Sequence, residues 1–184
     1  SGKELRLKQQ YLLVSAGIQS IIAKHLLHNA IDELPHKIAV HINDTHPALA
    51  VPELMRILVD EQHLDWEDAW DITTATLSYT NHTVLPEALE KWPVAIFQPL
   101  LPRIYQIVEE INERFCRQLW LRYPGDWERI AQMAVIANGQ VHMAHLAIAG
   151  SHSINGVAQL HTKILTTQVM SNFYHYTPSK FSNK

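Results

Sequence analysis

Apolar residues recur at helical spacing in two long stretches of the chain. Between Glu4 and His28 they return with the helical period, which predicts a long amphipathic helix that begins abruptly, without a capping residue. From Pro102 a similar pattern predicts a helix of about five turns, ended by Pro124-Gly125-Asp126. Both helices are therefore expected to pack one face against a core.

Two short apolar runs predict strands, each followed by a turn. Lys37–Asn43 is rich in branched residues and precedes the turn Asp44-Thr45-His46-Pro47 and a helix from Ala48 to about Gln62. Leu77–Thr80 precedes the exit turn Asn81-His82-Thr83. Each strand is thus expected to end in polar residues.

The remaining segments predict further helices and turns. Asp65 is placed to cap a helix whose first turn is acidic, and Asn138-Gly139 predicts a turn. From about Met143 to Thr167, small and apolar residues alternate around Gly150 and Gly156, which predicts helices packed closely on their neighbours.

Strands separated by helices indicate a parallel, doubly wound sheet, because a parallel strand can be reached only through a crossover connection. The expected class is therefore α/β and helix-rich, with a parallel sheet of few strands. So small a sheet is a poor match for so many helices, and Phe181-Ser182-Asn183-Lys184 lies where a further strand could run. We therefore expect both ends to be cut from a longer protein.

Composition and charge narrow the class of partner. The 184 residues are 47% hydrophobic and 18% charged, which suits an ordinary globular protein with a core. A net charge of -3 with scattered Lys and Arg argues against nucleic acid. No apolar run reaches the ~20 residues of a membrane span, and Ser1 begins no signal peptide. The single cysteine, Cys116, is expected to serve packing in a reducing, cytoplasmic compartment.

Candidate chemistry lies in the two turns that follow the predicted strands. Ligands of open parallel sheets bind beyond the carboxyl ends of the strands. If the two strands are neighbours, Asp44, His46 and His82 converge on a crevice of donors and acceptors that suits a hydroxylated ligand such as a sugar. An equally weighted alternative is that Asp44 and Thr45 cap a helix, while His46 and His82 tie loops together.

Other candidate sites are weaker. Glu87 and Glu90 could form a carboxylate pair of the kind glycoside hydrolases use, although solvated acids at a helix start explain them better. His25 with His28, and His142 with His145, are spaced as possible metal ligands, but no zinc motif accompanies them, so no metal is expected. No serine nucleophile motif or glycine-rich phosphate loop occurs in the sequence.

Several long sequence segments closely resemble those of the α-glucan phosphorylase family (glycogen, starch or maltodextrin phosphorylases). Their order and spacing match that family over nearly the whole chain. The segments are His41-Ile42-Asn43-Asp44-Thr45-His46-Pro47, Val51-Pro52-Glu53-Leu54-Met55-Arg56, Tyr79-Thr80-Asn81-His82-Thr83-Val84-Leu85-Pro86-Glu87-Ala88-Leu89-Glu90 and Asn155-Gly156-Val157-Ala158.

The resemblance implies a glycosyltransferase of two Rossmann-like domains with its active site between them. Residues 1–184 resemble the later, C-terminal part of the N-terminal domain. Such enzymes cleave the terminal α-1,4 link of a glucan with phosphate and release glucose 1-phosphate with retained configuration. Pyridoxal phosphate assists as a proton shuttle, and the parent is expected to be a homodimer. The C-terminal cofactor domain, with the lysine that binds the cofactor, is absent from this chain.

The resemblance also implies substrate-binding roles for individual residues, and no catalytic residue. His82 resembles the residue that contacts the 6-hydroxyl of the glucosyl unit, with Asn155 and Val157 beside that hydroxyl. The neighbouring side pocket resembles that of the family at Asp44, His46, Thr83, Glu87 and Ala88. The isolated chain is therefore expected to be inactive, because it contains only part of the sugar-binding wall.

Two alternatives from other classes remain at this point. One is a non-catalytic glucan-binding or interaction module with the same fold. The other is a metal-dependent hydrolase built on the histidines. The sequence does not distinguish glycogen, starch and maltodextrin as the preferred substrate.

Overall fold

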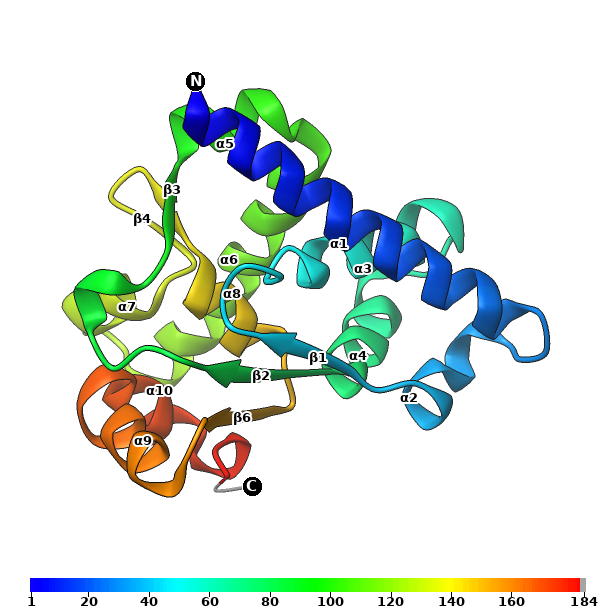
Figure 1. Ribbon diagram of the computed structural model, residues 1–184. Coiled ribbons are helices and arrows are strands. Elements are labelled where there is room, and N and C mark those ends of the chain that lie inside the picture. Colours follow the sequence, from blue (N-terminus) through cyan, green and yellow to red (C-terminus); the bar gives the residue numbers. More distant parts are fainter. Residues whose placement is uncertain (183–184) are drawn as a thin grey trace.

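A small parallel sheet is the centre of the computed structural model, which describes residues 1–182 (Figure 1). Its strand order is β1-β2-β6. The strands are β1 (Val40–Asn43), β2 (Leu77–Asn81) and β6 (Ser153–Gly156). All three are parallel, with Asn43 opposite Thr80 and Asn81 opposite Gly156. The predicted α/β class with few parallel strands is confirmed, although the predicted first strand began three residues too early.

Helices supply most of the structure. The α-helices are α1 (Gly2–Leu26), α2 (Leu34–Lys37), α3 (Ala50–Arg56), α4 (Trp66–Thr76), α5 (Val94–Leu100), α6 (Pro102–Arg122), α7 (Trp127–Met133), α8 (Met143–Ala149), α9 (Gln159–Ile164) and α10 (Ser171–Tyr176). Short 3₁₀ or π segments are η1 (Ile31–Glu33), η2 (Ile57–Glu61), η3 (Pro86–Ala88), η4 (Leu165–Val169) and η5 (Pro178–Lys180). The predicted helices from Pro102 and after Asp65 are confirmed, and the Asp65 side chain accepts from the amide of Asp68 at 2.8 Å.

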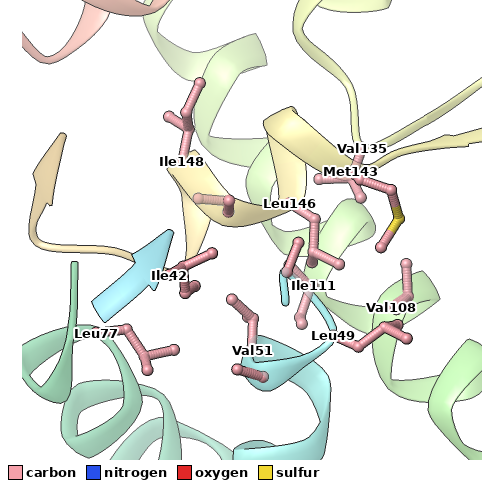
Figure 2. Close-up of a cluster of buried hydrophobic side chains, with 14 of the residues drawn as sticks. Ile42, Leu49, Val51, Leu77, Val108, Ile111, Val135, Met143, Leu146 and Ile148 are labelled. Atoms are coloured by element: carbon pink, nitrogen blue, oxygen red, sulfur yellow. The ribbon is translucent and has the colours of Figure 1, made fainter. Parts of the chain in front are cut away.

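The core lies between the sheet and the helices that follow its strands. Figure 2 shows Ile42 of β1 and Leu77 of β2 facing Val51 of α3, Ile111 of α6 and Leu146 of α8. All five side chains are almost fully buried. α8 can pass close to α3 because Gly150, directly after it, has no side chain: a Cβ there would lie 2.5 Å from Cγ1 of Val51. The tightly packed small residues predicted here are therefore confirmed at Gly150.

A second, antiparallel sheet was not predicted. It has the order β3-β5-β4, from β3 (Lys91–Pro93), β4 (Ile136–Ala137) and β5 (Gln140–His142). The predicted turn at Asn138-Gly139 connects β4 to β5, with a positive φ at both residues. Strands this short carry too little alternation to be recognised in a sequence. They matter because β3 ends the loop that leads away from His82.

Two sequence expectations need correction, and a third is supported. α1 is capped after all, because the Ser1 side chain accepts from the amide of Glu4, and Glu4 returns the contact as a capping box. The predicted helical stretch from Met143 to Thr167 contains β6, which is a strand. Beyond it, Phe181 forms an isolated parallel bridge with Ile154, so a strand-like segment does begin there, while 183–184 lie outside the described residues.

Candidate functional site: the carboxyl edge of the parallel sheet

The register of the three strands brings their exit turns to one edge. β1, β2 and β6 end at Asn43, Asn81 and Gly156, and their carboxyl ends lie next to one another in the sheet. The amide of Asp44 donates to the carbonyl oxygen of Thr80 at 2.9 Å, so the first turn starts directly beside β2. The two turns predicted to be neighbours therefore share a rim.

His82 is an exposed histidine of this rim. Its Nε2 lies 2.5 Å from Oδ1 of Asn43, the last residue of β1. The backbone around His82 is also tied down, because Asn81 is buried, donates to the Tyr79 hydroxyl at 2.9 Å and accepts from the amide of Thr83 at 2.8 Å. The imidazole is thus held on a fixed turn and contacts the neighbouring strand.

Asp44 organises its own turn. It has a positive φ of 72°, and its Oδ1 accepts from the amide of Thr45 at 2.7 Å. It does not cap the next helix, since α3 begins at Ala50 and its N-cap residue, Leu49, makes no side-chain capping bond. The capping alternative is therefore wrong for α3. His46 is exposed on the same turn.

A line of polar side chains crosses all three strands just below the rim. Nε2 of His41 lies 2.5 Å from Oγ1 of Thr80, and that hydroxyl lies 2.5 Å from Oδ1 of Asn155. Since the hydroxyl donates its one proton to Asn155, it accepts from His41. This row of hydrogen bonds, which sequence reasoning missed, fixes Asn155 on β6 relative to β1. The alternation of His41 and Asn43 along one strand was the available signal.

Two further predicted residues follow β6 and β2 at the rim. Val157 comes directly after β6 and is 58% exposed. Behind it, the amide of Gly156 donates to the Thr162 hydroxyl at 2.9 Å, which holds the start of α9 against the strand. Thr83 accepts from the amide of Leu85 at 3.3 Å in the loop after β2. Both positions therefore have a locally supported backbone.

The pair of glutamates does not form a carboxylate dyad in this structure. Glu87 and Ala88 are exposed on η3. Glu90 is half-buried, and its Oε2 accepts from Gln10 of α1 at 3.4 Å, while its carbonyl accepts from the amide of Met143 at 3.1 Å. Glu90 thus anchors the end of the loop, and Glu87 faces solvent near the rim.

One histidine of each predicted pair contacts a backbone carbonyl oxygen. Nε2 of His25 lies 2.6 Å from the carbonyl oxygen of Ala30, and Nδ1 of His145 lies 2.8 Å from that of Ala134. His142 and His145 stack with ring centroids 4.9 Å apart. Burial lowers the pKa of His145 to about 4 and also lowers the pKa of His142. Within residues 1–182, no three His, Cys, Asp or Glu side chains lie together as metal ligands.

Cys116 is half-buried on α6, where burial raises the pKa of its thiol. A raised thiol pKa disfavours the nucleophilic thiolate, so the packing role predicted for Cys116 is supported. Among the described residues, no helix is long and apolar enough to cross a membrane.

Taken together, the rim offers imidazole, amide, carboxylate and hydroxyl groups on fixed strand ends. Such groups bind and orient a polyhydroxylated ligand through hydrogen bonds. The fold and this edge define an α/β protein with a polar rim at the carboxyl ends of parallel strands, the place where open parallel sheets bind their ligands.

The chain belongs to the carbohydrate phosphorylase family, whose model matches residues 1–184. It is 60% identical over 184 residues to a glycogen phosphorylase of Bacillus subtilis (strain 168). It is 50% and 49% identical over 195 aligned positions to the muscle forms of glycogen phosphorylase of Mus musculus and Homo sapiens. In each comparison all of this chain is covered, but only 23% of the relative.

Proposed function

We propose that this chain supplies part of the glucosyl-binding wall of an α-1,4-glucan phosphorylase. The whole enzyme would be a glycosyltransferase that releases glucose 1-phosphate from a glucan and inorganic phosphate. The observation that carries the proposal is the contact between His82 and Asn43. It joins the exit turns of two parallel strands in a chain of the carbohydrate phosphorylase family.

In this proposal, each residue of the rim has a binding role. His82 contacts the 6-hydroxyl of the glucosyl unit, and its carbonyl faces the region of the anomeric carbon. Asn155 and Val157 flank the same hydroxyl. The neighbouring side pocket is lined by Asp44, His46, Thr83, Glu87 and Ala88. The positions of these residues support the proposed roles. All of them lie on or directly after the carboxyl ends of the three strands, or in the loop that follows β2.

The contribution of this wall is orientation of the sugar. A fixed imidazole that hydrogen-bonds a hydroxyl favours ligands that carry it, since an analogue without it leaves the imidazole unpaired in a desolvated site. Holding the glucosyl unit in one pose reduces the entropy lost on reaching the transition state. No residue of this chain is assigned a proton transfer.

Lys180 is not placed to hold pyridoxal phosphate, which would supply the proton-transfer group of the whole enzyme when bound. A lysine forms a Schiff base through its unprotonated amine, which a lowered pKa favours. Burial lowers the pKa of Lys180 to about 8, but its Nζ donates to the carbonyl oxygen of Ile148 at 3.2 Å. Lys180 also lines a cavity with Thr74 and His152, at the amino ends of β2 and β6. We therefore assign the cofactor lysine to the remainder of the parent protein.

The proposed partners of this segment are an α-1,4-glucan, phosphate and the remainder of the phosphorylase chain, in a cytoplasmic homodimer. The free thiol of Cys116 supports a reducing compartment. The exposed leucines of α1, Leu12 and Leu13, support a covering partner, because a large exposed apolar patch marks an interface.

A chimeric enzyme tests the proposal. The corresponding segment of the Bacillus subtilis glycogen phosphorylase is replaced by this chain, and glucose 1-phosphate release from maltoheptaose is measured. We expect activity in the chimera and a roughly 10- to 100-fold lower kcat/KM after His82→Ala, the cost of one lost hydrogen bond to substrate. The matched control is His152→Ala at the other end of β6, which should leave kcat/KM unchanged.

An equal effect of both histidine substitutions would contradict the proposal. The isolated 184-residue chain should release no glucose 1-phosphate from maltoheptaose and phosphate, and measurable release would contradict the assignment of the missing chemistry to the rest of the enzyme.

A further inference from the structure

Asn43 is the protein group in contact with the imidazole of His82. Its Oδ1 lies 2.5 Å from Nε2 of the histidine. A carbonyl oxygen of an amide can only accept a hydrogen bond, so Nε2 must carry the proton. A neutral imidazole has one ring proton, and Nδ1 is then left with a lone pair.

From this contact we infer that Asn43 is a positioning residue that fixes the tautomer of His82. The tautomer determines whether the imidazole donates or accepts in its hydrogen bond with substrate. With Nε2 protonated, Nδ1 accepts a hydrogen bond, and the sugar hydroxyl that faces it must donate. The inference rests on the proposed function, in which His82 contacts the 6-hydroxyl of a glucosyl unit. It adds a specificity rule, because a group that cannot donate is rejected.

Asn43 is suited to this role because it belongs to a strand. In the sheet it pairs with Thr80, and the amide of the next residue, Asp44, donates to the carbonyl of Thr80. Two residues earlier, His41 joins Thr80 and Asn155 in the polar line across the sheet. A binding group on a strand is held more precisely than one on a loop.

The turn that carries His82 is fixed from the other side. The buried Asn81 binds the Tyr79 hydroxyl through its amide nitrogen and the backbone of Thr83 through its oxygen. The imidazole therefore has little freedom to leave Asn43 through movement of its backbone. The short contact between the two side chains is a consequence of the strand register.

The tautomer is measured directly by nitrogen-15 NMR of the histidine rings in the full 184-residue chain, at about pH 8, above the ordinary pKa of an imidazole. We expect a protonated Nε2 in His82, with its proton protected from solvent exchange. In Asn43→Ala this protection should be lost. In Asn43→Asp it should persist, because a carboxylate oxygen also accepts from Nε2 and favours the doubly protonated ring.

Asn172→Ala is the matched control, since the amide of Asn172 donates to exposed Gln132 far along the chain. It should leave the His82 signals unchanged. Circular dichroism of all variants reports whether they fold. An unprotonated Nε2 in the unmodified chain, or unchanged exchange in folded Asn43→Ala, would overturn the inference.

The specificity rule is tested in the chimeric phosphorylase, run in the direction of glucan synthesis with glucose 1-phosphate or its 6-deoxy-6-fluoro analogue. Fluorine cannot donate a hydrogen bond. We expect the chimera to use the analogue with a kcat/KM roughly 10- to 100-fold lower. In Asn43→Asp the discrimination should fall several-fold, because Nδ1 then donates, and Asn43→Ala should mainly raise KM.

The two proposals fail in different ways. If His82→Ala leaves activity unchanged while the NMR result holds, the proposed contact with substrate is wrong and the tautomer assignment stands. If His82→Ala lowers activity but the fluorinated analogue is used as well as glucose 1-phosphate, the specificity role of Asn43 is wrong.

Discussion

Glu53 is a fully buried carboxylate at the contact between α1 and α3. It accepts from the Tyr11 hydroxyl at 2.9 Å, from the Ser15 hydroxyl and from Nε of Arg56 at 2.6 Å. The hydrogen bond to Glu53 raises the pKa of Arg56, so the guanidinium stays charged. Since α3 follows the turn that carries Asp44, Glu53 helps to support the rim from behind.

Replacing this carboxylate should destabilise the fold. Glu53→Gln removes the charge that pairs with the partly buried Arg56, and we expect the free energy of unfolding to fall by about 2–3 kcal/mol. Glu113→Gln is the control, because Glu113 forms an exposed pair with Arg117, and its loss should cost under about 0.5 kcal/mol. Urea denaturation measures both. Equal losses in the two variants would show that Glu53 contributes no more than a surface pair.

His145 makes stability depend on pH. Burial lowers its pKa from an ordinary 6.5 to about 4, so the unfolded chain binds this proton more readily than the folded one. The contribution of His145 to the free energy of unfolding is fully present above about pH 6.5. It is lost as the pH falls toward about 4, by on the order of 3 kcal/mol. His145→Asn keeps a donor for Ala134 and should flatten this dependence. Denaturation midpoints that vary equally with pH in both proteins would contradict this.

Individual site residues could be predicted from sequence only partly. The turns after β1 and β2 were predicted to meet because parallel strands expose their carboxyl ends at one edge, and the contact between Asn43 and His82 confirms the meeting. Asn43 and Thr80 were missed as contacts, because which side chain bridges two strands depends on register. Register is set by packing of the whole sheet rather than by local pattern.

At the scale of elements, the long helices and the strands β1 and β2 were predictable, whereas β6 and the three antiparallel strands were not. α1 and α6 each present many apolar positions at one period. β6 has only four residues and lies among small residues. Its hydrophobic pattern could therefore not be separated from that of the predicted helical segments on both sides. The pairing that makes it a strand comes from β2, far away in sequence.

Two glycine-to-alanine substitutions should have opposite effects on stability, one where a strand meets a helix and one on the surface of a helix. In Gly156→Ala, the new Cβ would lie 2.7 Å from the backbone nitrogen of Thr162, which cannot move without shifting α9. We expect a loss of about 1–3 kcal/mol. In Gly17→Ala, nothing lies within 4 Å of the new Cβ on α1. A gain of roughly 0.5–1 kcal/mol is expected there, because alanine favours a helix. Thermal denaturation measures both, and changes of the same sign would contradict the difference.

At the scale of the whole molecule, α1 carries exposed leucines among the polar residues of its outer side. Leu7 and Ile18 are buried, whereas Leu12 and Leu13 are 66% and 78% exposed. Leu27, directly after α1, is 73% exposed. Figure 1 shows α1 lying along the outside of the other helices. Large apolar side chains that lie together on a surface mark an interaction site. Since the chain spans 23% of its glycogen phosphorylase relatives, most of a protein of that length lies outside it.

The outer leucines should make the 184-residue chain self-associate. Light scattering after size-exclusion chromatography is expected to detect dimers or larger species at micromolar concentration. Leu12→Lys combined with Leu13→Glu should shift the chain toward monomer, because charged residues disfavour an apolar interface. Leu121→Glu, which changes an exposed leucine of α6, is the control. A monomer before substitution, or an equal response to the control, would contradict this role of α1.

The glucosyl position in the chimeric phosphorylase is the most direct test of the whole account. A crystal structure of the chimera with a bound maltooligosaccharide should place the 6-hydroxyl of one glucosyl unit within hydrogen-bond distance of Nδ1 of His82, with Asn155 beside it. A glucosyl unit bound away from the carboxyl edge of β1, β2 and β6, with the His82 ring facing solvent, would contradict it.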